Sequence, residues 1–247
     1  MYFLIIVGAR GLGRVLLSLA RGDVAHNSVW TVLGFLDTAG PSILSPDCDV
    51  PVIGDPLTYV PHPREIFVVG IGDPFEKQKY IAPLLEKGAQ FVEFLGGTRL
   101  GERTKIGKSV VFGMDVTVST DCQLDDFVFV DGGTTIGHDV GIGAYSHIGP
   151  RCFIGGNAKI GRYVTIHPMA GISRGVSIGE GAVIGARSYC ETFRLIRPSS
   201  AIQPGSLGGH RWLRRKTSFL GYPAKRQERF DFAQGQINPR CCLRVAE

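Results

Sequence analysis

The second half of the chain is built on a period of six residues. A large aliphatic or aromatic residue recurs at every sixth place through fifteen consecutive hexads, and a small or β-branched residue follows four places after each one. The large residues are Leu100, Ile106, Phe112, Val118, Leu124, Val130, Ile136, Ile142, Ile148, Ile154, Ile160, Ile166, Ile172, Ile178 and Ile184. The smaller ones are Thr104, Val110, Val116, Cys122, Val128, Thr134, Val140, Ser146, Cys152, Ala158, Val164, Ala170, Val176, Ala182 and Ser188.

This spacing excludes both an isolated helix and a flat sheet. An α-helix repeats every 3.6 residues and a strand every two, and neither period fits the pattern. A hexapeptide solenoid does fit, because each hexad then forms one face of a triangular coil. We expect the large residue to fill the interior and the small residue to permit the tight corner. Three hexads make one coil, so residues 100–189 predict five coils that stack as parallel strands about 4.8 Å apart.

Residues 1–92 follow a different pattern, in which apolar strands alternate with helices. The expected strands span residues 2–7, 32–36, 66–70 and 91–94, and the expected helices span residues 13–21 and 75–87. Strands and helices in this order predict a parallel sheet with right-handed crossovers. The chain is therefore expected to join an α/β, Rossmann-like domain to a parallel β-helix.

A glycine-rich turn, GARGLG, lies between the first strand and the first helix. Glycine lets the backbone approach a phosphate or a ribose, and a helix N-terminus favours negative charge. However, Gly8, Gly11 and Gly13 do not have the dinucleotide spacing, and the sheet is too small for a full dinucleotide fold. We therefore favour a nucleotide-sugar over NAD. Asp37, at the end of the second strand, is either an acceptor for a ribose or uracil group or a solvated strand end.

Composition narrows the class of protein further. Apolar residues make up 44% of the 247 residues, and the net charge of +5 does not by itself imply nucleic acid. The six cysteines lack paired metal-ligand spacing, which favours a reduced cytoplasmic setting without disulfides or a bound metal. The apolar run at residues 2–7 is a strand rather than a signal peptide, and no run approaches the roughly 20 apolar residues of a membrane span.

Several motifs together resemble a known family. They are IIVGARGLGRV at residues 5–15, GFLD at 34–37, VVGIGD at 68–73, the hexads, GHD at 137–139, YSHIGP at 145–150 and GYPAK at 221–225. The combination is similar to bacterial acetyltransferases that join a small nucleotide-binding domain to a left-handed parallel β-helix. That family includes sialic-acid O-acetyltransferases and N-acetyltransferases of nucleotide-linked 4-amino-4,6-dideoxy sugars. We expect a nucleotide-sugar-binding domain at 1–95, an acyltransferase β-helix at 96–189 and an extension at 190–247.

The resemblance implies roles for individual residues. His138 matches the catalytic histidine of the family, Asp139 the acidic residue beside it, and His147 a second histidine that contacts acetyl-CoA. Pro168 and Ala186 are also expected at acetyl-CoA. Positions expected to hold the nucleotide-sugar are Gly8, Gly11, Leu12, Gly13, Asp37, Thr38 and Gly72. The chain departs from the family at Arg10, where glycine is usual, and at Leu12, where histidine is common.

The chemistry of these residues fits acetyl transfer. Histidine is suited to take a proton from an attacking amine or hydroxyl near neutral pH, and Asp139 would orient the ring of His138. The plain alternative is that His138 is a solvated surface residue and that His147 is a structural histidine at a coil corner. Gly156 lies 18 residues, or one coil, beyond His138. Its backbone N–H is therefore a candidate oxyanion donor.

The leading hypothesis is an acetyl-CoA-dependent N-acetyltransferase that acts on a UDP- or dTDP-linked 4-amino-dideoxy sugar in polysaccharide biosynthesis. Alternatives are a sialic-acid type O-acetyltransferase and a non-catalytic nucleotide-sugar-binding scaffold. The resemblance also implies a homotrimer with CoA in the groove between neighbouring chains, and both His138 and His147 would point into that groove. The basic run at residues 210–216 is either a solvated face or a site for CoA phosphates.

Overall fold

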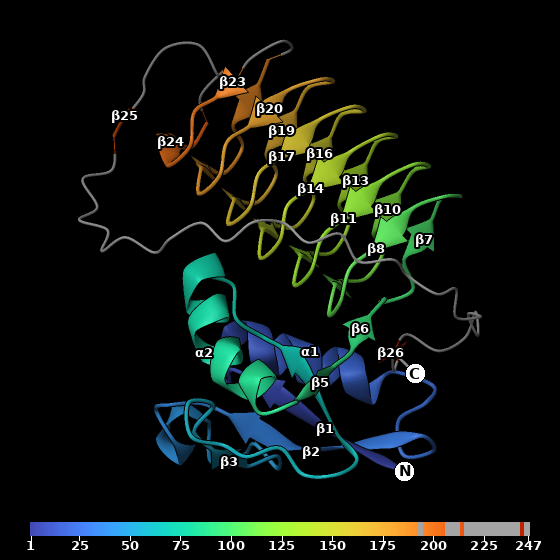
Figure 1. Ribbon diagram of the computed structural model, residues 1–247, viewed down its shortest axis with the longest axis vertical. Helices are drawn as coiled ribbons and strands as arrows, with labels where there is room; N and C mark the ends of the chain where they lie inside the picture. The colour runs from blue at the N-terminus through green and yellow to red at the C-terminus, as the bar shows by residue number, and fades with distance from the viewer. Residues whose placement is uncertain (192–194, 206–212, 215–242, 245–247) are drawn as a thin grey trace.

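The computed structural model describes residues 1–191, 195–205, 213–214 and 243–244. Two parts follow one another along the chain (Figure 1). An α/β domain comes first, and a stack of triangular coils follows it. No helix in these ranges is long and apolar enough to cross a membrane.

The first domain is a five-stranded parallel sheet with the strand order β3-β2-β1-β4-β5. Its strands are β1 (Tyr2–Val7), β2 (Trp30–Leu36), β3 (Val52–Gly54), β4 (Glu65–Val69) and β5 (Gln90–Phe91). The helices are α1 (Gly11–Arg21), α2 (Pro74–Glu86) and a short 3-10 helix, η1 (Pro41–Ile43). This order is typical of the Rossmann-like half-fold and confirms the predicted class. The short edge strand β3 was not predicted, because only three residues form it.

The two helices cover opposite faces of this sheet. Leu4 and Ile6 of β1 share a core with Leu16 of α1, whereas Ile5 and Val7 share a core with Ile81 of α2. Alternate residues of a strand point to opposite faces, so these two cores lie on the two sides of the sheet. Both cores also contain side chains of the second domain, which therefore packs directly against the first.

The second domain is a left-handed parallel β-helix whose short strands form three faces. Face 1 contains β6 (Glu93–Phe94), β9 (Val111–Phe112), β12 (Phe129–Val130), β15 (His147–Ile148), β18 (Thr165–Ile166), β21 (Val183–Ile184) and β24 (Ser200–Ile202). Face 2 contains β7 (Arg99–Leu100), β10 (Thr117–Val118), β13 (Thr135–Ile136), β16 (Phe153–Ile154), β19 (Gly171–Ile172) and β22 (Tyr189–Cys190). Face 3 contains β8 (Lys105–Ile106), β11 (Gln123–Leu124), β14 (Gly141–Ile142), β17 (Lys159–Ile160), β20 (Ser177–Ile178) and β23 (Leu195–Ile196).

The large and the small residue of each hexad both fill the interior. The expectation that the small residue forms the corner was therefore wrong. Ile136, Ile154 and Ala158 are all 0% exposed, so the small residue packs inside beside the large one. The turn itself is made by the residue between them, three places after the large one. That residue has a positive φ throughout, as in Asp139 (59°) and Asn157 (63°). Asp, Asn and Gly are frequent at this place because they adopt the left-handed conformation most easily.

The coils extend beyond the expected boundaries of 96 and 189. β6 pairs with β9 before the first predicted hexad, and β23 and β24 pair with β20 and β21 after the last. The period in fact continues through Cys190, Ile196 and Ile202, which are all buried. The limit at residue 189 was wrong because a cysteine replaces the aliphatic residue at the next interior place.

Two short strands from the last part of the chain pair with the ends of face 1. β25 (Leu213–Arg214) pairs antiparallel with β24, and β26 (Leu243–Arg244) pairs antiparallel with β6. Apart from β25, the basic run at 210–216 lies outside the described residues. The GYPAK motif at 221–225, Cys241 and Cys242 also lie outside them.

Candidate functional site

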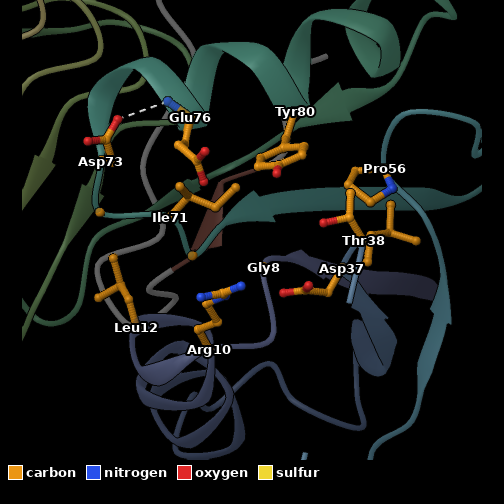
Figure 2. Close-up of a pocket in the computed structure, with 13 residues that line it drawn as sticks. Gly8, Arg10, Leu12, Asp37, Thr38, Pro56, Ile71, Asp73, Glu76 and Tyr80 are labelled. Atoms are coloured by element: carbon orange, nitrogen blue, oxygen red, sulfur yellow. Dashed lines mark hydrogen bonds between the residues drawn. The ribbon is translucent and has the colours of Figure 1, made fainter. Parts of the chain in front are cut away.

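A pocket of about 270 Å³ opens at the carboxyl ends of β1, β2 and β4 (Figure 2). In parallel α/β sheets this edge is where ligands bind, at the point where the strand order reverses. The residues that line the pocket come from the ends of these strands and the loops that follow them, from the first turn of α1, from the loop after β3, and from the first two turns of α2. They are Gly8, Arg10, Leu12, Leu36, Asp37, Thr38, Pro56, Gly70, Ile71, Gly72, Asp73, Glu76 and Tyr80.

The glycine turn allows β1, α1 and β4 to approach one another at the base of the pocket. A Cβ at Gly13 would lie 1.8 Å from the backbone oxygen of Gly8. A Cβ at Gly8 would lie 2.9 Å from Cγ1 of Ile71, and the φ of Gly8 is +99°. No other residue fits either position, so the turn after β1 depends on glycine for close packing.

Asp37 is held by backbone amides and also faces the pocket. Its two carboxylate oxygens accept hydrogen bonds from the amides of Ala9 (3.0 Å) and Ala39 (2.9 Å). The side chain therefore ties the loop after β1 to the loop after β2, which is a structural role that the sequence did not reveal. Each carboxylate oxygen can accept a second hydrogen bond, so this role leaves acceptor capacity for a ligand.

Most of the residues expected to hold a nucleotide-sugar meet at this pocket. Gly8, Leu12, Asp37, Thr38 and Gly72 line it. Gly11 and Gly13 lie in the first turn of α1 and do not line it. Gly13 is buried against the backbone of Gly8, whereas Gly11 is exposed and a Cβ there would contact no neighbouring atom.

Four polar or charged side chains at the pocket were missed from the sequence. Arg10 extends toward Asp37, while Glu76 and Tyr80 project into the pocket from α2 (Figure 2). Asp73 caps α2, because its Oδ1 accepts hydrogen bonds from the amides of Phe75 (2.9 Å) and Glu76 (3.0 Å). The location of IGDP directly after a buried parallel strand was the signal that could have indicated Asp73, Glu76 and Tyr80. Arg10 had been noted only as a departure from the family.

His138 and Asp139 lie at the corner between faces 2 and 3 and form a close pair. Nδ1 of His138 lies 2.6 Å from Oδ2 of Asp139, and the two side chains are 49% and 52% exposed. Asp139 occupies the positive-φ corner place, which fixes its carboxylate beside the imidazole ring. A carboxylate at Nδ1 selects the tautomer that carries its proton on that nitrogen, and Nε2 is then free to accept a proton.

Gly156 lies directly beside His138 in the next coil, as the 18-residue spacing predicted. A Cβ at Gly156 would lie 2.8 Å from Nε2 of His138, so a larger residue would displace the ring. Among the described residues, no group accepts a hydrogen bond from the Gly156 amide. Pro150 and Pro168 occupy the same place in other hexads. Proline has no backbone N–H, so its presence there agrees with a coil that does not use the N–H at this place.

His147 lies in strand β15 on face 1, and the expectation of a coil corner was wrong. Its ring stacks on Phe129 with centroids 5.0 Å apart, and a Cβ at Gly72 would lie 3.7 Å from its Cε1. Its Nδ1 is buried and has no hydrogen-bond partner among the described residues. Burial, and then the nearby charge of Lys77, lower the pKa of His147 to about 3, so the ring is neutral.

The two histidines are therefore not together within one chain. Face 1, which carries His147 and contacts the first domain, lies opposite the corner that carries His138. Pro168 and Ala186 stack one coil apart at the third corner, between faces 1 and 2. The residues expected at acetyl-CoA are thus distributed around the coil.

The cysteines in the coils are packing residues. Cys122, Cys152 and Cys190 are 1–2% exposed and unpaired. Burial raises the pKa of the Cys152 and Cys190 thiols to about 11, so both remain protonated. Within the described ranges, no group of three His, Cys, Asp or Glu side chains is placed to hold a metal ion.

Comparisons with known proteins match both parts of the chain. The family model of the PglD N-terminal domain matches residues 3–84, and the model of the bacterial transferase hexapeptide (six repeats) matches residues 157–192. No curated protein matches the sequence significantly.

Solved structures match over most of the chain at low sequence identity. A variant of perosamine N-acetyltransferase from Caulobacter crescentus, in complex with CoA and GDP-perosamine, has a TM-score of 0.70 and 22% identity over 82% of this chain and 94% of its own. The acetyltransferase domain of PglB from Neisseria gonorrhoeae, in complex with acetyl coenzyme A, has a TM-score of 0.69 and 22% identity over 83% and 97%. WeeI from Acinetobacter baumannii has a TM-score of 0.64 and 18% identity over 86% and 100%. Residues 3–84 are therefore similar to the PglD N-terminal domain and residues 157–192 to the bacterial transferase hexapeptide, and the chain has the two-domain fold of the solved perosamine N-acetyltransferase and of the PglB acetyltransferase domain.

Proposed function

We propose that this protein is an acetyl-CoA-dependent N-acetyltransferase that acetylates the amino group of a nucleotide-linked 4-amino-dideoxy sugar, with UDP or dTDP as the nucleotide. The observation that carries the proposal is the His138–Asp139 pair, exposed beside an unengaged Gly156 amide. A base and an oxyanion donor at one place are what acyl transfer requires.

In the proposed mechanism, His138 acts as general base and Asp139 orients it. Nε2 of His138 takes a proton from the sugar amine as the amine nitrogen attacks the thioester carbonyl of acetyl-CoA. The Gly156 N–H donates to the oxyanion that forms. Collapse of this intermediate breaks the C–S bond, and the protonated imidazole returns the proton to the CoA thiolate. Protons and electron pairs balance without a metal or another cofactor.

The pocket of the first domain is the proposed site for the nucleotide-sugar. It lies where parallel sheets bind ligands, and its glycine turn lets the backbone approach phosphates. The solved perosamine N-acetyltransferase contains CoA and GDP-perosamine, which supports a nucleotide-linked amino sugar as the acceptor class. Because the nucleotide in that structure is GDP, a GDP-sugar belongs among the candidates to test.

We further propose that the active protein is a homotrimer. The pocket lies beside face 1, where Gly72 meets His147, whereas His138 occupies the opposite corner of the coil. His138 of one chain is therefore best placed to serve the pocket of a neighbouring chain, with acetyl-CoA in the groove between them. Light scattering tests this directly, since a fully active monomer would contradict it.

The substrate class is tested by CoA release in a thiol-reagent assay. We expect acetyl-CoA and a 4-amino nucleotide-sugar to release CoA, whereas the matching 4-hydroxy sugar does not. UDP-, dTDP- and GDP-linked sugars are compared in parallel. Release only with hydroxyl acceptors such as sialic acids would indicate O-acetylation. Nucleotide-sugar binding without any CoA release would indicate a scaffold.

An enzyme of this class belongs to cytoplasmic polysaccharide biosynthesis, where activated sugars are available.

A further inference from the structure

Lys77 is a fully buried lysine at the contact between the two domains. It lies in α2 and is 1% exposed. Its Nζ donates hydrogen bonds to the carbonyl oxygens of Phe127 (3.0 Å) and Tyr145 (3.3 Å). Phe127 and Tyr145 occupy the same corner of two successive coils, between faces 3 and 1. The Nζ atom of one lysine in the first domain thus joins two coils of the second.

The coil geometry explains why a donor is needed there. Phe127 and Tyr145 are positive-φ corner residues, with φ of 60° and 65°. Among the described residues, neither carbonyl accepts a backbone hydrogen bond. At an exposed corner water satisfies such a carbonyl, but α2 covers this corner, and a buried carbonyl without a donor is costly. Lys77 supplies the missing donor.

Aromatic rings pack along the same contact between α2 and the coils. Phe91, Phe127, Tyr145, Tyr163 and Phe75 form an aromatic ladder in this order, with successive ring centroids 5.0–5.4 Å apart. The ladder begins in β5, crosses three coils and ends in α2. Burial raises the pKa of Tyr145 to about 12, which agrees with a dry environment.

The same helix turn carries the wall of the pocket. Asp73 and Glu76 line the pocket within one turn of Lys77, and Gly72, directly before α2, faces His147. The position of this wall relative to the β-helix therefore depends on how α2 is attached. Lys77 hydrogen-bonds two carbonyls of the coil backbone, and Gln78 of the same helix hydrogen-bonds the side chain of Tyr163.

We propose that Lys77 is a positioning residue: by binding the two corner carbonyls, it fixes the pocket wall at Gly72, Asp73 and Glu76 against the β-helix. The expected effect on catalysis rests on the proposed acetyl transfer. The effect on the geometry of the wall does not rest on it, so the two are tested separately.

The first test uses hydrogen exchange and needs no substrate. In full-length Lys77→Met, the amides of residues 72, 73 and 75–77 are expected to exchange about tenfold faster than in the wild type, because the variant leaves two buried carbonyls without a donor. Amides of β1 and β2 should keep their rates. Lys108→Met is the matched control, since Lys108 is an exposed lysine at the same corner. Unchanged exchange at residues 72, 73 and 75–77 in Lys77→Met would overturn the proposal, whatever the enzyme does.

The second test compares how Lys77 variants change KM for the acceptor sugar and KM for acetyl-CoA. Lys77→Met is expected to raise KM for the acceptor sugar about tenfold and to leave KM for acetyl-CoA within about twofold, because the displaced wall belongs to the acceptor pocket. Lys77→Gln keeps two N–H donors on a shorter side chain and should restore part of the loss. It also replaces Lys77→Met if that variant does not fold.

A purely structural lysine would lower the amount of folded protein without changing either KM, and that result would contradict a positioning role. Absence of turnover in the wild type would instead count against the proposed function, and the exchange test would still decide on Lys77.

Discussion

His147 shows at the scale of one residue how position, rather than residue type, determines chemistry. The sequence places two imidazoles nine residues apart and suggests that they act together. In the structure, His138 is exposed beside Asp139, whereas His147 is stacked on Phe129 at the domain contact. The hexad period predicts which residues point inward, but it cannot show which outward face another domain covers.

The low pKa of His147 predicts acid sensitivity. The folded pKa is about 3, below the usual 6.5 of the unfolded chain. The neutral ring therefore contributes stability above pH 6.5 that is lost as the pH falls toward 3, because the unfolded chain takes up the proton first. Between pH 7 and pH 5 the wild type should lose about 1–2 kcal/mol more unfolding free energy than His147→Phe, which preserves the stack on Phe129.

Urea unfolding at the two pH values measures this difference. All other titrating groups are shared by the two proteins, so they cancel in the comparison. Equal losses in the wild type and in His147→Phe would show that the ring is solvated in the folded protein.

At the scale of secondary-structure elements, the periodic features were predictable and the corners were not. The strands β1, β2 and β4 and both helices lie within about two residues of their predicted bounds, because apolar periodicity reports burial. The single strand predicted at 91–94 is instead divided between β5 of the first sheet and β6 of face 1, and β3 was missed. The conformation of the corners depends on φ at the place of Asp139 and Asn157, which apolar periodicity does not report. The last coils were missed because Cys190 interrupts the aliphatic column.

Helix α2 offers a prediction at this scale, since Asp73 caps it and also lines the pocket. Asp73→Ala removes the acceptor for the amides of Phe75 and Glu76 and should destabilise the first turn by about 1 kcal/mol. Hydrogen exchange at residues 75–77 should then become about fivefold faster.

Asp73→Asn is the matched control, because asparagine also caps helices well and should keep the wild-type exchange rate. If Asp73→Ala exchanged at the wild-type rate, the carboxylate would not hold the helix start. The pocket wall would then depend on Lys77 and the aromatic ladder alone.

At the scale of the whole molecule, the arrangement of the domains separates the two halves of the proposed site. The first domain covers face 1, and His138 lies at the opposite corner. The sequence predicted both domains and the resemblance supplied the candidate residues, but neither indicated which face the domains share. That contact involves buried side chains such as Phe129 and Lys77, whose partners lie far away along the chain.

The most direct test of the account is turnover by His138→Ala with a 4-amino nucleotide-sugar and acetyl-CoA. We predict that kcat/KM falls by about a hundredfold or more, because a general base contributes roughly this much to proton transfer. Calorimetric binding of the nucleotide-sugar should persist, since the residues that line the pocket do not include His138. Near-normal turnover by His138→Ala would contradict the proposed role of this imidazole and the mechanism built on it.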